Sequence, residues 1–238
     1  WPEHYVIALG IAFSCCKDFC EKLNFYDKLN KLENVLNLWS IRSLSLIGRI
    51  NVVKNLAISK LVYNSSVLTP PKDFAQKVNE RIFKFIWNYK PDKIKRNTLI
   101  RPLCKGGLNM VNFEMLEKSL KAAWVKRLAD SPDNSNWKSA FLESTKAVGG
   151  TLILQCNYNF KNLLRLDLPQ FYKDVLETWQ TLQSHEPKEA NDIKKELIWN
   201  NQFITIDDKS FFFNTWHKSG VNQIADLLDE NNKFLTFN

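Results

Sequence analysis

Three runs of apolar residues recur at helical spacing in the first 90 residues, and they constrain the fold more than any other feature. The first run contains Phe25, Leu29, Leu32, Leu36 and Trp39. The second contains Leu46, Ile50, Val53, Ala57, Leu61 and Leu68, and the third contains Phe74, Val78, Ile82 and Phe85. Steps of three and four residues put all members of a run on one face of an α-helix. The chain is therefore predicted to build a helical bundle.

The ends of the second helix are marked by local signals. We interpret "RSLSLIGRINVVKNLAISKLVY", Arg42 to Tyr63, as one long helix with Ser45 as a suitable N-cap. "TPPKD", Thr69 to Asp73, ends it because proline cannot continue a helix. Gly48 costs a helix about 1 kcal/mol relative to Ala. It indicates either close helix packing or the close approach of another backbone, and we favour packing.

Extended structure is predicted at two places. "VIALGIAFS", Val6 to Ser14, is typical of a buried strand, and "FITIDDKSFFF", Phe203 to Phe213, of a hairpin that turns at Asp207-Asp208-Lys209. "SPDNSN", Ser131 to Asn136, is a polar break and the best candidate for a domain boundary. The predicted fold class is mainly α, a helical bundle followed by a small α+β C-terminal segment with one hairpin.

Positive charge is concentrated in one part of the chain. The net charge is +8, but residues 42–127 alone hold 18 Lys and Arg against 5 Asp and Glu. A solvated surface usually mixes both signs, so this segregation predicts a polyanionic partner such as RNA or an RNA–DNA duplex. The candidate nucleic-acid-binding residues are Arg42, Arg49, Lys54, Lys60, Lys84, Lys90, Lys93, Lys95, Arg96, Arg101 and Lys105.

The most basic stretch, residues 88–110, leaves two questions open. Gly106-Gly107 could expose backbone amides to a phosphate, but the pair lacks P-loop spacing and a tight turn is favoured. Trp87 and Tyr89 lie among the cations and could stack on bases. Core packing is favoured for Trp87 because it extends an apolar stripe, whereas the role of Tyr89 stays open.

The cysteines and the apolar runs bear on location. Five cysteines without a CxxC pair favour reduced thiols in an intracellular protein, in the nucleus or the cytoplasm rather than secreted. "VIALGIAF", the longest strongly apolar run near the start, is too short to cross a bilayer, which takes about 20 residues. No membrane association is therefore expected.

The sequence offers little catalytic chemistry. His4, His185 and His217 are scattered and match no metal-binding or nucleophile motif. Asp207-Asp208 could hold a metal ion at a hairpin tip, as carboxylate pairs do in polymerases, but Asp is also a common turn residue. We favour the turn, and we expect no catalytic residue, no metal site and no cofactor in this chain.

Taken together, several motifs resemble one protein family. From about Leu9 to Asn238 the chain resembles the region after the palm in LINE-type non-LTR retrotransposon reverse transcriptases. The similarity lies in "LGIAFS" (Leu9 to Ser14), Asn24 to Tyr63, "FKFIW" (Phe83 to Trp87), "KIKRNTLI" (Lys93 to Ile100), "KGGLNMVNF" (Lys105 to Phe113), "LKAAWVKRL" (Leu120 to Leu128), "LIWNNQFITI" (Leu197 to Ile206) and "GVNQIADLL" (Gly220 to Leu228).

The resemblance implies that the chain has three segments with different roles. Residues 1–24 would be a remnant of the last palm strand near the primer grip, 25–130 a basic, helical, thumb-like domain, and 131–238 a post-thumb segment. The thumb would hold template–primer backbone through Arg49, Lys54 and Lys60. The catalytic aspartates of the family precede "LGI" and have no counterpart here. Polymerase activity and its Mg²⁺ would then belong to the palm and fingers of a parent RNA-directed DNA polymerase, and the chain itself is expected not to be an enzyme.

Two other functions remain open. The acidic, Trp-rich C-terminal part could make the chain a protein-interaction or scaffold module derived from a retroelement. An enzyme centred on Asp207 and Asp208 is the least favoured. The first alternative predicts protein binding with little dependence on salt.

Overall fold

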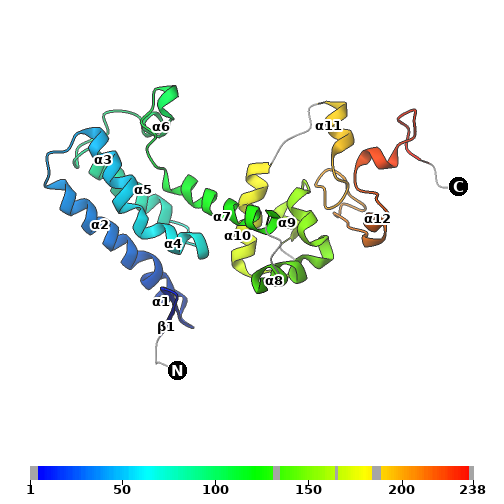
Figure 1. The fold of residues 1–238 in the computed structure, drawn as a ribbon, viewed down its shortest axis with the longest axis horizontal. Helices are drawn as coiled ribbons and strands as arrows, with labels where there is room; N and C mark the ends of the chain where they lie inside the picture. Colours follow the sequence, from blue (N-terminus) through cyan, green and yellow to red (C-terminus); the bar gives the residue numbers. More distant parts are fainter. Residues whose placement is uncertain (1–4, 131–134, 164–165, 184–188, 236–238) are drawn as a thin grey trace. The chain divides into compact units, whose positions relative to one another are not determined.

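The computed structural model describes residues 5–130, 135–163, 166–183 and 189–235, and these are mainly helical (Figure 1). One small two-stranded sheet accompanies the helices in the described part, so the predicted fold class is confirmed. The chain forms two compact units, Trp1–Leu120 and Lys121–Asn238. Residues 131–134 of the predicted break lie outside the described residues. The division into 1–24, 25–130 and 131–238 stays a prediction.

The first unit contains the sheet and most of the basic residues. Its elements are β1 (Val6–Ala8), β2 (Ile11–Phe13), α1 (Lys17–Glu21), the π turn η1 (Lys22–Tyr26), α2 (Asp27–Ser40), α3 (Leu46–Val52), the π turn η2 (Val53–Ala57), α4 (Ser59–Val67), α5 (Phe74–Ile86), α6 (Arg96–Ile100) and the 3₁₀ turn η3 (Leu103–Lys105). The long helix α7 (Phe113–Asp130) begins in this unit and continues into the second.

The second unit is built from shorter pieces. They are α8 (Asn136–Thr145), η4 (Lys146–Val148), η5 (Gly150–Gln155), α9 (Phe160–Leu163), α10 (Gln170–Gln183), α11 (Ala190–Lys195), α12 (Asn214–Lys218) and η6 (Ile224–Leu227). Its core gathers Phe141, Tyr158 and Trp199, all at most 1% exposed. The buried Tyr158 hydroxyl has a hydrogen-bond partner in this core, because it donates to the Leu176 carbonyl oxygen at 2.6 Å.

The three predicted stripes meet in the core of the first unit. Helices α2, α3–α4 and α5 lie side by side (Figure 1). Phe74, Val78, Ile82 and Phe85 of α5 are all 0% exposed, and the stripes of the other two helices close around them. The loop after α4 coincides with "TPPKD", and Ser45 caps α3 by accepting a hydrogen bond from the Gly48 amide. The three stripes and this break are confirmed, but the second helix begins at Leu46 rather than at Arg42 and contains the π turn η2.

Both predictions of extended structure need correction. Val6 to Ser14 is not one buried strand, because Leu9 and Gly10 adopt positive φ (49° and 78°) and reverse the chain. Two positive φ values at a two-residue turn match a type I′ hairpin, and the residues of β1 are exposed. Around Asp207-Asp208 the turn forms, with φ of 49° and 58°, but only the single bridge between Ile206 and Lys209 accompanies it.

A buried carboxamide fastens the N-terminal hairpin to the bundle. Asn24, 3% exposed in the π turn η1, accepts from the Ala12 amide at 2.9 Å and donates to the Ala12 carbonyl oxygen at 2.8 Å. The side chain thus satisfies both backbone groups of a buried strand residue, as a neighbouring strand would. Tyr63 of α4 adds a hydroxyl bond of 2.7 Å to the Leu9 carbonyl oxygen at the turn.

We expect Asn24→Ala to lower the free energy of unfolding by about 2–3 kcal/mol, because both backbone groups of Ala12 would lose their buried partner. Urea denaturation measures the loss, and hydrogen exchange should show faster exchange at Ala12. The control is Asn30→Ala at an exposed position of α2, which should stay within about 0.5 kcal/mol of wild type. Equal stabilities for the two variants would contradict the assigned role of Asn24.

Candidate nucleic-acid interface

The outer face of α3–η2–α4 is a long surface free of acidic residues. Its exposed positions recur every four residues: Ile47, Asn51, Asn55, Ser59 and Tyr63. In a regular α-helix four residues rotate about 40° more than one full turn, so a row with this spacing would wind around the helix. The π turn η2 takes more residues per turn and offsets part of this drift. The row therefore stays on the side opposite the buried stripe.

Two cations flank this row, which we call the α3–α4 face. Lys60 is exposed and Lys54 is half-buried, and neither forms an ion pair with a described residue. From residue 34 to residue 72 the sequence contains no Asp or Glu. The charge count drew attention to the lysines but missed the exposed row between them, whose members other than Ile47 are polar. Its four-residue spacing and the absence of acids were the signals that could have identified it.

Arg49 lies elsewhere than expected. Its side chain points into the core, where the residue is 7% exposed, and its Nη1 donates to the Phe85 carbonyl oxygen at 3.0 Å. The guanidinium also lies over the Phe85 ring, 5.1 Å from the centroid. A cation at the C-terminal end of α5 satisfies a terminal carbonyl and opposes the negative end of the helix dipole. This placement corrects the expectation that Arg49 contacts phosphate.

Arg42 also differs from its predicted setting. It precedes the helix, because α3 begins at Leu46, and its guanidinium lies 4.6 Å from the Trp39 ring centroid. The residue is exposed. It therefore remains available to a ligand at the end of α2.

Of the remaining candidate cations, Lys84 lies in the last turn of α5 and the others follow that helix. The exposed members are Lys84, Lys90, Lys93, Lys95, Arg96, Arg101 and Lys105. The Arg96 side chain already has protein partners. Its Nε donates to the Asp92 carboxylate at 2.8 Å, and its guanidinium lies 4.7 Å from the Phe83 ring centroid. The others form no ion pair with a described residue. We call the segment from Asn88 to Met110 the basic loop.

The glycine pair in the basic loop makes a turn. The Gly106 amide donates to the Leu103 carbonyl oxygen at 3.0 Å, and the Gly107 amide donates to the Pro102 carbonyl oxygen at 3.1 Å. Both amides are therefore used within the loop rather than exposed to a phosphate. A Cβ on Gly107 would lie 1.9 Å from the Arg101 carbonyl oxygen, so only glycine fits there. The tight-turn prediction is confirmed.

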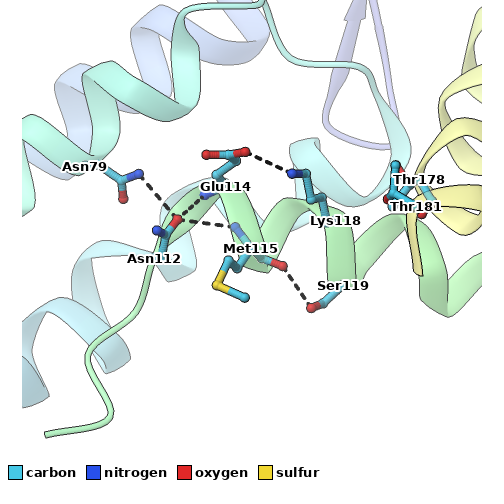
Figure 2. A network of polar contacts seen from close by, with 8 residues as sticks. All are labelled: Asn79, Asn112, Glu114, Met115, Lys118, Ser119, Thr178 and Thr181. Atoms are coloured by element: carbon cyan, nitrogen blue, oxygen red, sulfur yellow. Dashed lines mark hydrogen bonds and ion pairs between the residues drawn. The ribbon is translucent and has the colours of Figure 1, made fainter. Parts of the chain in front are cut away.

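Asparagine side chains fix the start of α7 where the basic loop ends. Asn112 accepts from the amides of Glu114 and Met115 (Figure 2). Asn79 of α5 accepts from the Phe113 amide at 2.9 Å. These bonds satisfy backbone donors that the first turn of a helix leaves open. Asn112 is thus the cap of this helix, and α5 holds both ends of the basic loop.

Within the described residues, no group of three potential metal ligands comes together. Asp207 and Asp208 are exposed turn residues, as the favoured interpretation expected. The five cysteines carry free thiols, and burial raises the pKa of the Cys156 thiol to about 12. No helix in the described ranges has the length and apolar character needed to cross a membrane.

Comparison with known proteins yields one relevant similarity. The chain is 24% identical over 216 residues to a Xenopus laevis protein described as "Transposon TX1 uncharacterized 149 kDa protein". The match covers 86% of this chain and 16% of the relative, so the chain spans about a sixth of that protein's length. No protein-family model matches. The chain is therefore similar to a transposon protein over most of its length.

We expect Arg49→Ala to lower the free energy of unfolding by about 2–3 kcal/mol, because the buried Phe85 carbonyl loses a charged donor. Lys60→Ala, at an exposed position of the same helix, should change it by at most about 0.5 kcal/mol. Urea denaturation of both variants measures the difference. A fully stable Arg49→Ala protein would show that the buried bond is dispensable.

The two loop glycines should respond unequally to alanine. Gly106→Ala places a side chain in open space at φ +73°, a strain of about 1–2 kcal/mol. Gly107→Ala should cost more, because the Arg101 backbone must move to admit the new Cβ. Thermal denaturation of the two variants measures both losses. A smaller loss for Gly107→Ala than for Gly106→Ala would contradict the observed turn.

Proposed function

We propose that this chain is the thumb and C-terminal part of a retrotransposon reverse transcriptase of the LINE type, and that it holds the template–primer duplex. The observation that carries the proposal is the α3–α4 face, an exposed helical surface without acids in a unit that also displays the basic loop. The similarity to a transposon protein supports a retroelement origin. The sequence motifs support the finer assignment to the region after the palm.

The α3–α4 face suits a duplex in shape as well as in charge. About 22 residues of helix at 1.5 Å each span roughly 33 Å. An A-form duplex offers a wide, shallow minor groove lined with 2′-hydroxyls, which small polar side chains such as Asn51 and Ser59 can approach. Lys54 and Lys60 would contact phosphates at the groove edges. Such contacts give affinity without sequence preference, as a translocating polymerase needs.

Catalysis would reside in other parts of a longer parent protein. The proposed partners are the palm and fingers of that protein, which would supply the aspartates and their Mg²⁺. The described residues of this chain bring together no group of three His, Cys, Asp or Glu side chains. The chain is proposed to be a binding part of the polymerase and not an enzyme by itself.

A second function, a protein-interaction module, is favoured by one feature of the second unit. Trp216, Val221, Leu227, Phe234 and Leu235 line an apolar groove of about 420 Å³ near the end of the described chain. Phe234 and Leu235 are more than half exposed. A protein partner bound there would depend little on salt.

We expect binding of an RNA–DNA hybrid to weaken steeply with salt, and Lys54→Ala with Lys60→Ala to reduce the slope of log K against log salt by about two. Fluorescence anisotropy with a labelled hybrid measures the slope. Arg49 is left intact because it belongs to the core.

The matched control removes two lysines that already have carboxylate partners, Lys77→Ala with Lys118→Ala. It changes the net charge equally, so its slope should stay closer to wild type. Equal slopes for the two double variants would assign the effect to net charge alone. A salt-independent affinity in the wild-type chain would favour the protein-interaction module.

A further inference from the structure

The end of α5 closes with a well-defined capping motif. The Asn88 amide donates to the Phe85 carbonyl oxygen at 3.0 Å, and the Tyr89 amide donates to the Lys84 carbonyl oxygen at 2.8 Å. This pair of bonds is the Schellman arrangement, which requires one residue in the left-handed region. Asn88, with φ +53°, fills that position, and Asn is one of the residues that tolerate it.

Tyr89 adopts a second left-handed conformation that the cap does not require. Its φ is +60°, a value that bulky side chains avoid. The Lys90 amide donates to the Trp87 carbonyl oxygen at 3.1 Å, so Asn88 and Tyr89 are also the two central residues of a type I′ turn. Backbone strain of this kind, where the surroundings maintain it, often marks a functional position.

The strained backbone presents the Tyr89 ring to solvent in a fixed place. The residue is 59% exposed, and its hydroxyl donates to the Asn37 Oδ1 of α2 at 2.9 Å. Of the aromatic and cation–π contacts within the described residues, none involves this ring. A tethered aromatic ring with an open face is a surface on which a planar group can stack.

The charges around Tyr89 select the kind of planar group. Lys84, Lys90 and Lys93 are exposed, and between Glu80 and Asp92 the chain contains no acid. Asp92 itself is bonded to Arg96. Aromatic rings set among cations stack nucleobases while the cations contact the sugar–phosphate chain. Bases inside a duplex already stack on each other, so the available base is an unpaired one.

We propose that Tyr89 is a stacking platform for an unpaired nucleobase in a single-stranded extension of the bound template–primer. The inference rests on the proposed function, because it assumes that the duplex lies on the same unit. It adds a site that the charge pattern alone does not contain.

The test uses two probes on the full chain, a blunt RNA–DNA hybrid and the same hybrid with a short single-stranded 5′ extension that carries 2-aminopurine. We expect the extension to raise the affinity about 5-fold or more, and binding to quench the 2-aminopurine fluorescence through stacking. If blunt and extended hybrids bind equally well, the proposed stacking on Tyr89 is wrong, whereas the proposal that the chain binds the duplex still stands. If neither hybrid binds, both the stacking proposal and the duplex-binding proposal are overturned.

Two variants separate stacking from a structural role. Tyr89→Asn removes the ring but adopts positive φ readily, so it should abolish the gain from the extension, leave blunt binding unchanged and keep the melting temperature at or above that of wild type. Tyr89→Phe keeps the ring and should keep most of the gain. A lower melting temperature together with weaker blunt binding for Tyr89→Asn would show that Tyr89 is structural, and the inference would fail.

Discussion

Burial of one face of α5 is the constraint on which the first unit depends. Its four stripe residues are completely buried between α2 and α3–α4, and each contributes about 1.5–3 kcal/mol on transfer from water. Because this face is fixed, the C-terminal end of the helix is fixed as well. That end meets the inward-pointing Arg49, and the chain beyond it must leave along the surface. The position of the basic loop is thus a consequence of how α5 packs.

The same packing divides the positive charge into two kinds. Arg49 is desolvated and has a structural role, bonded to a helix-terminal carbonyl and lying against an aromatic ring. Lys60 and most cations of the basic loop remain in water, where phosphates can displace their counterions. A charge count treats all of these residues alike. Only the exposed group contributes to the proposed duplex surface.

Parts of this arrangement were predictable from particular residues. The helical stripes, the Ser45 cap and the core position of Trp87 all follow from spacing and residue type, because they depend on contacts within one or two turns. The extended segments were less predictable. "VIALGIAF" alternates little, so the sequence alone predicts the interior of a strand where the structure has a turn at Leu9-Gly10. The segment around Asp207 has the composition of a hairpin, but its C-terminal flank packs three aromatic rings around Trp199 instead of pairing as a strand.

The sequence by itself determined that the chain is mainly helical, which apolar stripes three of its helices bury, and that one segment is strongly basic. These properties come from local periodicity, from proline and capping residues, and from composition. The tertiary structure decided which basic side chains face solvent, that a π turn keeps the exposed row on one face, and that Tyr89 is held with positive φ. The positions of the Arg49 and Tyr89 side chains depend on partners far along the chain, the carbonyl 36 residues from Arg49 and the carboxamide 52 residues from Tyr89. Such partners meet only when the helices pack.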